Sequence, residues 1–499
     1  MALLLTLTTI FIPIYILRGV ASLTKKIFRP DLDQMIVTHS AVLAMDDPYE
    51  RPQWNLCVWI VLDRNPEIND LRETLLERVF LRKLPNGQFA DPEYQQYYSK
   101  WLGFLFWKWD PDFDKYHHIR LYSEDTQNLG GIITEEKFRQ ILKTLTWAPF
   151  KVKTSPWECL LVNDLQLNDT PREQGTTVNL QSALIFRVHH GLCDGFSILR
   201  ALMQELGKIS ITTAVRPHFP KKGFLRRVFE ICTFPLLAPY QFSRTLVDAY
   251  DVNGWHRGGC GRLKRLNASF TPRIPTEFIK EAKDKHGVSF TAVLMSGIVG
   301  GIRNVMTQQG LEIPKNMNAA IPVPLPNHPL KLRNHWVFSF LKLPIGIEDP
   351  LRRLQKTERN IRKLKESLVP AFSFFIIPIV GGTFPGLMKI FNRNNFSTLL
   401  ISNFPGPQVS EGKNFFTTKE GKYYVLDMNF NAGLGCGNVG LGLFMLSYKD
   451  GVRIVTEVDD RILPDDASVQ LLNEEILKEI TYLHTTSPSL ENSQLSLDK

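Results

Sequence analysis

The chain has 499 residues and a formal net charge of +9, so it can bury a large core and would usually divide into two domains. It contains no zinc-finger spacing and no RNA-binding aromatic segment, so a nucleic-acid partner is not expected. The modest positive charge suits an anionic membrane surface or a phosphate-bearing substrate. The six cysteines are scattered, which is typical of free thiols in a reducing compartment.

The N-terminal residues 2–17 carry no charge, and basic residues follow them at 18, 25, 26 and 29. A bilayer span needs roughly 17–25 apolar residues, so this run is only just long enough. We interpret residues 1–30 as a membrane anchor that either spans the bilayer or lies in its interface; a cleaved signal peptide and a buried soluble helix are the alternatives. Because the basic residues follow the apolar run, the rest of the chain is expected to face the cytosol, at the endoplasmic reticulum or alternatively at the plasma membrane.

Residues 31–207 are predicted to form the first domain. Apolar runs predict strands at 54–62, 157–162 and 182–187, and periodic apolar spacing predicts helices at 68–80, 136–144 and 196–203. The aromatic segment 101–109 is either a strand packed on the core or part of the wall of an apolar channel. Strands and helices mixed in this way predict an α/β or α+β layered domain.

Residues 208–265 are predicted to be a crossover between domains. The basic residues Lys221, Lys222, Arg226 and Arg227 adjoin an apolar run that is interrupted by prolines. One interpretation is a segment that lies on an anionic membrane. The other is an ordinary linker with a solvated charged face.

Residues 266–484 are predicted to form the second domain, and the polar, Ser-rich tail 485–499 is predicted to be disordered. Residues 369–388 are uncharged but contain several prolines and glycines, which indicates a kinked apolar helix. A β-hairpin with an Asp-Gly turn is expected within 441–458. The remaining patterns predict helices at 275–286, 289–306, 350–368 and 467–483, and strands at 318–323, 334–343 and 397–403.

Two histidines, His189 and His190, follow the strand at 182–187, and Asp194 and Gly195 begin the next helix. Histidine titrates near neutral pH, so an imidazole that faces a cleft can take a proton from a hydroxyl. Asp194 can hold the turn by pairing with an arginine or by accepting backbone N–H bonds, and Gly195 lets the backbone bend or approach a neighbour closely. No metal site is expected, and Cys193 is expected to pack. On residue chemistry alone, a catalytic histidine and a chance histidine pair are equally supported.

The pattern His189-His190-x-x-x-Asp194-Gly195 after a strand resembles the signature of the CoA-dependent acyltransferase superfamily, which includes chloramphenicol acetyltransferase. The segment Ser402-Asn403-Phe404-Pro405-Gly406-Pro407 resembles Ser-Asn-Val-Pro-Gly-Pro of one branch, the bifunctional wax ester synthase/diacylglycerol O-acyltransferases. The segment Ser155-Pro156-Trp157 resembles that branch's Pro-Leu-Trp. The similarity extends from about residue 33 to about residue 480.

The resemblance implies two chloramphenicol-acetyltransferase-like domains, each a mixed sheet flanked by helices, with an active-site tunnel at their interface. It implies that acyl-CoA, a co-substrate rather than a bound cofactor, acylates a long-chain fatty alcohol or diacylglycerol at a membrane. His190 would be the general base, Asp194 would hold the loop, and His189 would support them. The resemblance assigns structural roles at the tunnel to Gly195, Thr291, Ser402, Asn403, Pro405 and Gly406.

The sequence departs from the bacterial branch at Thr291 and Ala292, which stand where that branch has Asn-Asp. A threonine hydroxyl keeps one hydrogen-bonding group, whereas alanine cannot replace a carboxylate. Two alternatives therefore stand beside the lipid acyltransferase: a non-catalytic, membrane-bound lipid-binding protein of the same fold, and an acyltransferase for a different small acceptor. The intact His190 and Asp194 favour an enzyme, and the apolar segments favour a lipid acceptor. The sequence specifies neither chain length nor oligomeric state.

Overall fold

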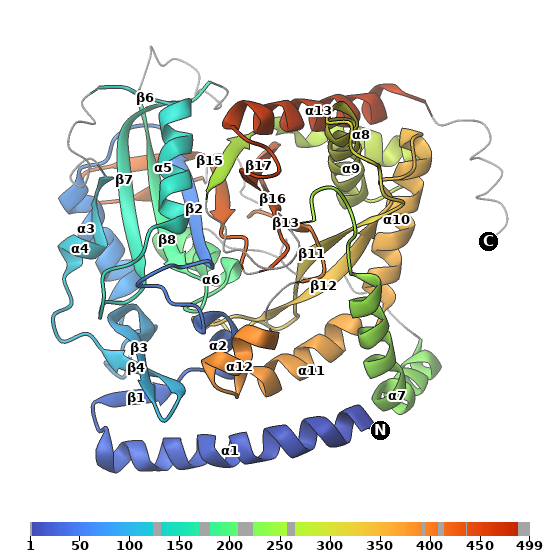
Figure 1. Ribbon diagram of the computed structural model, residues 1–499. Coiled ribbons are helices and arrows are strands. Elements are labelled where there is room, and N and C mark those ends of the chain that lie inside the picture. The colour runs from blue at the N-terminus through green and yellow to red at the C-terminus, as the bar shows by residue number, and fades with distance from the viewer. Residues whose placement is uncertain are drawn as a thin grey trace.

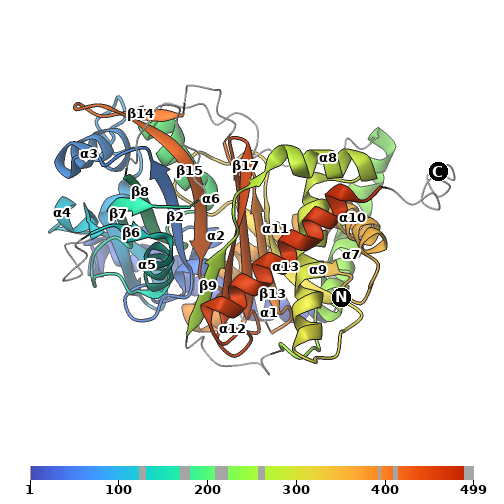
Figure 2. The ribbon, with the colours of Figure 1, turned by 90° about the horizontal axis from the view of Figure 1, so that it is seen from above.

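Two seven-stranded mixed sheets stand side by side, and each is flanked by helices (Figure 1). The computed structural model describes residues 2–122, 131–168, 180–207, 223–256, 265–391, 395–407, 414–435 and 437–487. Figure 2 shows α3 and α4 of the first half and α8 and α10 of the second half at opposite ends of the molecule, with the sheets between them. The predicted class of mixed sheets flanked by helices is therefore confirmed.

The first sheet has the order β14-β15-β2-β8-β7-β5, with β6 beside β7. Every residue of β2 is buried because both faces of the sheet are covered, which explains the continuous apolar run. The predicted helix at 68–80 is confirmed, although it changes to π-helical geometry after residue 75, and a similar change follows α6. The bounds are β2 Asn55–Leu62, β5 Ile119–Leu121, β6 Ile133–Thr134, β7 Trp157–Gln166, β8 Gln181–His189, α3 Ile68–Leu75, α4 Lys115–His118, α5 Glu135–Trp147 and α6 Gly195–Leu199.

The strands β14, Phe415–Thr417, and β15, Lys422–Ala432, come from the second half of the sequence but belong to the first sheet. β15 pairs antiparallel with β2, so that Ala432 lies opposite Leu56. The predicted boundary at 265/266 therefore does not separate the two sheets. Local sequence patterns do not show which distant strand a strand will pair with, which is why the exchange was not expected.

The second sheet has the order β10-β17-β16-β13-β11-β12, with β9 beside β17. The predicted hairpin with its Asp-Gly turn is confirmed as β16 and β17. Gly297 allows the helices α9 and α13 to pack closely, because any residue with a Cβ at this position would meet Ile480 at 2.3 Å. The bounds are β9 Leu266–Phe270, β10 Ile274–Pro275, β11 Met317–Pro324, β12 Trp336–Leu343, β13 Leu399–Phe404, β16 Leu441–Tyr448, β17 Gly451–Asp459, α8 Thr276–His286, α9 Phe290–Gln308, α10 Pro350–Glu366 and α13 Asp466–Thr485.

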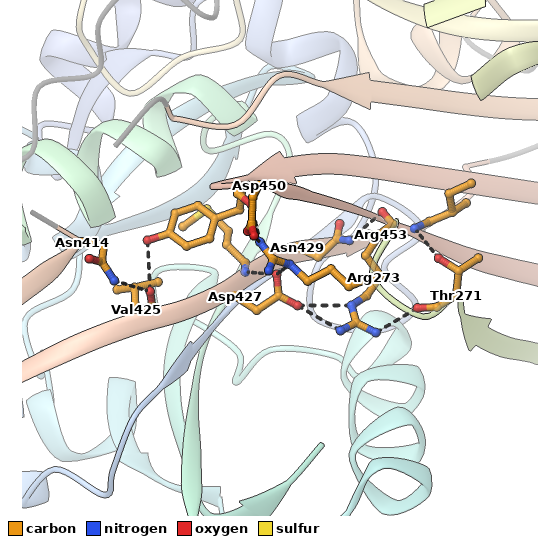
Figure 3. Close-up of polar contacts among 11 residues, drawn as sticks. Thr271, Arg273, Asn414, Val425, Asp427, Asn429, Asp450 and Arg453 are labelled. Carbon is orange, nitrogen blue, oxygen red and sulfur yellow. Dashed lines mark hydrogen bonds and ion pairs between the residues drawn. The ribbon is translucent and has the colours of Figure 1, made fainter. Parts of the chain in front are cut away.

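A buried ion pair joins the two sheets (Figure 3). Asp427 of β15 accepts hydrogen bonds from Arg453 of β17, whose Nη2 and Nε lie 3.1 and 3.2 Å from Oδ2. Arg453 Nη1 also donates to the carbonyl oxygen of Thr271 at 2.8 Å, and Asn429 Nδ2 donates to the carbonyl oxygen of Arg453 at 2.9 Å. Since Asp427 and Arg453 are each 2% exposed, this pair holds the halves together without solvent screening.

Four further helices gather on the side of the molecule opposite α13 (Figure 1). They are α1 Ala2–Phe28, α7 Phe224–Asp248, α11 Val369–Gly381 and α12 Pro385–Phe391, and a short helix, α2 Thr38–Ala44, packs above them. The predicted kinked apolar helix is confirmed as α11 and α12, which are separated by a break. The described part of the crossover forms α7 despite Pro235 and Pro239, whereas residues 208–222, including Lys221 and Lys222, lie outside the described residues.

The N-terminal segment packs on a small sheet of order β1-β4-β3, formed by Leu32–Met35, Gln96–Trp101 and Phe104–Trp109. The aromatic segment at 101–109 is thus the turn and second strand of a hairpin. Its packing role is confirmed because Phe104 and Phe106 are buried. Most of the predicted disordered tail, residues 488–499, lies outside the described residues.

Among the described residues, α9 is the single helix whose length and hydropathy would let it cross a bilayer, and 72% of its window is buried in the protein core. The bent pair α10 and α11, with an angle of 53°, meets the same criteria together. The prediction of a membrane anchor at residues 1–30 gains no support from this search.

Candidate active site between the two sheets

A cavity of about 830 Å³ lies between the two halves. The first half contributes β2, the end of β8 and the start of α6, and the second contributes β11, β12, β13 and β16. Its walls are largely apolar, with Leu56, Val58, Phe338, Leu400, Phe444 and Leu446 among them. The polar lining groups include His190, Asp194, His328, His335, Ser402 and Asn403. This arrangement agrees with the expected tunnel at the interface.

His190 stands directly after β8 and lines this cavity. Its backbone is fixed on both sides: the N–H donates to the carbonyl oxygen of Trp54 at 2.7 Å, and its own carbonyl oxygen accepts from Asn334 Nδ2 at 2.7 Å. The imidazole packs against the ring of Trp336, with centroids 5.3 Å apart. Within the described part of the chain, its Nδ1 has no hydrogen-bond partner.

Burial lowers the pKa of His190 below its ordinary value of 6.5, and this outweighs the opposite effect of the nearby Asp194 carboxylate. The imidazole is therefore neutral at pH 7. A neutral imidazole at the wall of a cavity can accept a proton from a bound hydroxyl.

His189 is fully buried and is not among the residues that line the cavity. Its Nδ1 accepts a hydrogen bond from the N–H of Gly191 at 3.3 Å, which assigns the ring proton to Nε2, and Nε2 lies 3.5 Å from Asp46 Oδ2. The N–H of His189 donates to the carbonyl oxygen of Pro156 at 2.9 Å, so the Ser155-Pro156-Trp157 segment holds the same turn. These contacts agree with the supporting role predicted for His189.

Asp194 caps the N-terminus of α6 and also reaches the second half. Its Oδ1 accepts from the N–H and the hydroxyl of Ser197, both at 3.0 Å. Its Oδ2 accepts from the N–H of His335 at 2.9 Å and lies 3.3 Å from His328 Nε2. Although burial alone would raise the pKa of Asp194, the hydrogen bonds from His328, Ser197 and His335 hold it below its ordinary value. A carboxylate with these contacts organises the loop.

Of the two contacts considered for Asp194, the structure has the backbone N–H bonds, from Ser197 and His335. The nearby Arg200 does not pair with it, since Arg200 is bound to Asp91 at 2.9 Å. The close backbone approach occurs at Gly191, where a Cβ would lie 2.6 Å from Ala44 Cα. A Cβ at Gly195 would meet Phe404 at an ordinary 3.6 Å, so Gly195 is not required for close approach.

The second motif lies across the cavity. Ser402, Asn403 and Pro405 line it from the end of β13, whereas Gly406 lies just beyond, where a Cβ would come within 1.8 Å of the carbonyl oxygen of Ser447. Asn403 Nδ2 donates to Thr291 Oγ1 at 3.3 Å, so the structure brings two of the predicted tunnel residues together. Ala292 is fully buried in α9.

Three residues of the loop before β12 belong to the site but were not predicted: His328, Asn334 and His335. The sequence around them predicted only the strands at 318–323 and 334–343, and Pro324 and Pro326 between them indicate a turn. Two histidines and an asparagine in such a turn are a weak signal, since their contacts with His190 and Asp194 depend on the packing of one half against the other.

No group of histidine, cysteine, aspartate and glutamate side chains suited to a metal ion occurs among the described residues. Cys193 is fully buried, and burial raises the pKa of its thiol well above the ordinary value. A neutral, buried thiol is a poor nucleophile, which agrees with the predicted packing role.

Comparison with known proteins supports the resemblance. Residues 332–481 match the model of the WS/DGAT C-terminal domain. A putative diacylglycerol O-acyltransferase of Mycobacterium tuberculosis is 23% identical over 426 residues, which cover 78% of each protein. The wax ester synthase/diacylglycerol acyltransferase from Marinobacter aquaeolei superposes with a TM-score of 0.56 at 16% identity, covering 91% of this chain and all of that one. The first condensation domain of the CDA synthetase gives 0.54 at 12% identity, covering 91% and 96%.

The predicted resemblance to wax ester synthase/diacylglycerol O-acyltransferases is thereby confirmed, and the chain is an acyltransferase. The fold is the mixed α/β fold of the wax ester synthase and condensation-domain structures. The roles assigned to His190, Asp194 and their neighbours stay predictions.

Proposed function

We propose that this chain, which carries the C-terminal domain of the WS/DGAT acyltransferases, transfers the acyl group of acyl-CoA to the hydroxyl of a long-chain fatty alcohol or of diacylglycerol. The observation that carries the proposal is a neutral imidazole, His190, in the wall of a large and mainly apolar cavity between the two halves. The apolar walls favour a lipid over a small polar acceptor.

Transfer of the acyl group from the thioester to a hydroxyl requires one base, positioned to remove the hydroxyl proton. The hydroxyl oxygen of the acceptor attacks the thioester carbonyl carbon while the His190 imidazole takes the hydroxyl proton. The C–S bond then breaks, and the leaving CoA sulfur receives that proton from the imidazolium. The products are an ester and free CoA, and acyl-CoA acts as co-substrate with no bound cofactor required.

Asp194 positions the loop in this proposal and does not take part in proton transfer. Its two oxygens hold the α6 N-terminus and the backbone at His335, so it fixes the loop that carries His190 against the second half. It makes no hydrogen bond with His190, and its role is therefore positioning. The hydrogen bond between Asn403 and Thr291 keeps the opposite wall in place.

We place the protein at a membrane, with the endoplasmic reticulum as the candidate and the catalytic domains on its cytosolic side. The support is the order of an apolar N-terminal run followed by basic residues. The Asn-x-Ser/Thr glycosylation sequences at Asn168, Asn267 and Asn395 should then carry no N-linked glycan. A mass decrease on glycosidase treatment of the protein expressed in animal cells would contradict this orientation.

The direct test is the protein in detergent with a labelled long-chain acyl-CoA, offered a fatty alcohol, a diacylglycerol or a small polar alcohol in turn. Labelled ester is expected with the lipid acceptors, accompanied by an equal amount of free CoA thiol. Ester from the small polar alcohol alone would favour the alternative acceptor class. If no acceptor gave ester, the non-catalytic lipid-binding alternative would replace the proposal.

A further inference from the structure

A second cavity, of about 180 Å³, adjoins the active-site cavity. The side chains of Trp54, Trp336, Phe338 and Leu400 line both cavities and so form the wall between them. Phe338 packs against both tryptophans, with ring centroids 6.0 Å from Trp54 and 4.6 Å from Trp336. The two spaces are thus separated by a layer of aromatic side chains.

The second cavity lies close to the proposed base. Asn334 lines this cavity, and its Nδ2 donates to the carbonyl oxygen of His190 at 2.7 Å. Trp336, in the shared wall, lies 5.3 Å from the His190 ring by centroids. A molecule that passed this wall would arrive at His190.

The outer part of the second cavity is formed by α7 and α11. α7 contributes Phe242 and Leu246, and α11 contributes Ser373, Ile376 and Ile377. The two helices are joined by ring contacts of Phe372 and by a hydrogen bond from the N–H of Leu368 to Gln241 Oε1 at 3.1 Å.

We call α1, α7, α11 and α12 the helical platform, since they lie on one side of the molecule (Figure 1). This platform exposes many large apolar side chains, of which Ile27, Phe224, Leu236, Phe375 and Ile390 are each at least 60% exposed. Single exposed apolar residues are ordinary, but a gathering of them on one side marks a surface for a partner or a membrane.

The charges of the platform favour a membrane. The sequences of the four helices contain seven lysines and arginines against one glutamate and one aspartate, both of which lie in α7, and α11 has no charged residue. Lys26 and Lys389 are exposed. Helices that combine exposed apolar side chains with basic residues lie in the interface of anionic bilayers.

The first helix lies along the protein rather than projecting from it. Tyr15 donates from its hydroxyl to the carbonyl oxygen of Pro378 in α11 at 2.8 Å, and Trp101 Nε1 donates to Thr24 Oγ1 at 3.2 Å. Ala21 is fully buried against the small sheet. These contacts fix α1 in the plane of the platform, which suits a helix in the membrane interface.

We propose that the platform lies flat on a lipid bilayer and that the second cavity binds the hydrocarbon chain of the lipid acceptor, which enters from the bilayer between α7 and α11. The proposal rests on the proposed function for the identity of the acceptor. A cavity of this size is below the roughly 300–1,000 Å³ of whole-ligand pockets, so it suits part of a chain.

A matched pair of substitutions on α7 tests whether the second cavity binds the hydrocarbon chain of the acceptor; we call this cavity the chain site. Leu246→Trp fills the second cavity, whereas Val247→Trp places the same side chain at a neighbouring position that is 75% exposed. With Leu246→Trp, the kcat/KM for a long-chain alcohol should fall about tenfold or more because the excluded methylene groups lose their burial. The kcat/KM for a short alcohol should not change, and Val247→Trp should change neither. Equal loss for both alcohols, or no loss, would overturn the assignment.

A second pair tests the platform. Leu236 of α7 is 79% exposed, and Leu471 is 39% exposed. Leu471 belongs to α13, the helix that lies on the side of the molecule opposite the platform (Figure 1). Leu236→Asp should lower flotation with vesicles of phosphatidylcholine and phosphatidylserine and the use of acceptor carried in them, while acceptor in detergent is used as before. Leu471→Asp should leave both unchanged. Equal vesicle binding by the two variants and the parent protein would overturn the proposal that the platform lies on the bilayer.

Cross-linking distinguishes failure of the chain site from failure of the proposed function. A long-chain alcohol with a diazirine in its alkyl chain, carried in the same vesicles, should label peptides of α7 and α11 after illumination, and Leu246→Trp but not Val247→Trp should abolish the labelling. This readout needs no catalysis. Should the parent protein make no ester, the proposed function fails, while such labelling would still support the chain site. Labelling elsewhere would overturn the chain site even in an active enzyme.

Discussion

Ester formation by His190→Ala is expected to fall by about 10²–10⁴-fold, the usual contribution of general-base catalysis. The imidazole is the one group in the proposed mechanism that removes the acceptor proton. The backbone N–H and carbonyl oxygen of His190 keep their hydrogen bonds with Trp54 and Asn334 when the side chain is removed. The fold and the binding of acyl-CoA should therefore survive. The measurement is the rate of labelled ester from acyl-CoA and a long-chain alcohol, with acyl-CoA affinity measured in parallel.

The matched control is His117→Ala, which removes a half-buried histidine of α4 outside the cavity lining. It should keep full activity. Equal ester yields from His190→Ala and the parent protein would remove His190 from the mechanism. His189→Ala should do less harm to the chemistry than His190→Ala, because His189 contacts Asp46 and the turn rather than the cavity.

The pH dependence follows from the direction of the His190 shift. Burial lowers the pKa of His190 below 6.5, and only the neutral ring accepts a proton. Activity should therefore be retained near pH 7 and fall on the acid side with a midpoint below 6.5. An acid limb centred above 6.5 would show that another group controls the rate.

Asp194→Asn should lower stability together with activity. The substitution keeps one carbonyl oxygen but places an amide nitrogen, itself a donor, where two of the four groups around the carboxylate converge. Because the pKa of Asp194 is held below its ordinary value, its contribution is present at neutral pH and is lost as the pH falls through that lowered pKa. The stability difference between the parent protein and Asp194→Asn should therefore narrow in acid, as measured by urea unfolding at several pH values.

The second large effect is expected at the ion pair between the sheets. Asp427→Ala should lower the free energy of unfolding by about 3–5 kcal/mol, because it leaves the Arg453 guanidinium buried and uncompensated. Both side chains are 2% exposed, so water cannot replace the lost carboxylate without opening the contact between β15 and β17. Chemical denaturation of the parent protein and the variant measures the difference.

Two variants control this result. Glu277→Ala removes a carboxylate from an exposed ion pair with Lys280 and should change stability little. The double variant Asp427→Leu/Arg453→Met replaces the buried pair by apolar side chains and should recover much of the loss. A small effect of Asp427→Ala alone would show that the carbonyl oxygen of Thr271, which accepts from Arg453 Nη1 at 2.8 Å, and water admitted by local opening solvate the guanidinium well enough.

The sequence determined the elements and the motif residues of this protein because their signals are local. The run at 54–62 predicted β2, the glycines and prolines of 369–388 predicted the kink between α11 and α12, and the Asp-Gly turn predicted the hairpin of β16 and β17. His190 and Asp194 were singled out in the same way, from their place between a strand and a helix. Each of these predictions depends on residues within a few turns of one another.

The tertiary structure alone decided which distant segments meet. The pairing of β15 with β2 moves a late segment into the first sheet, and the loop before β12 brings His328, Asn334 and His335 to the motif. Asp194 therefore accepts a backbone N–H bond from His335 of the second half and lies beside His328, and Gly191 rather than Gly195 makes the close approach. Such contacts are fixed by the packing of whole sheets and helices, whose free energy is summed over many residues far apart in the chain, so no local pattern contains them.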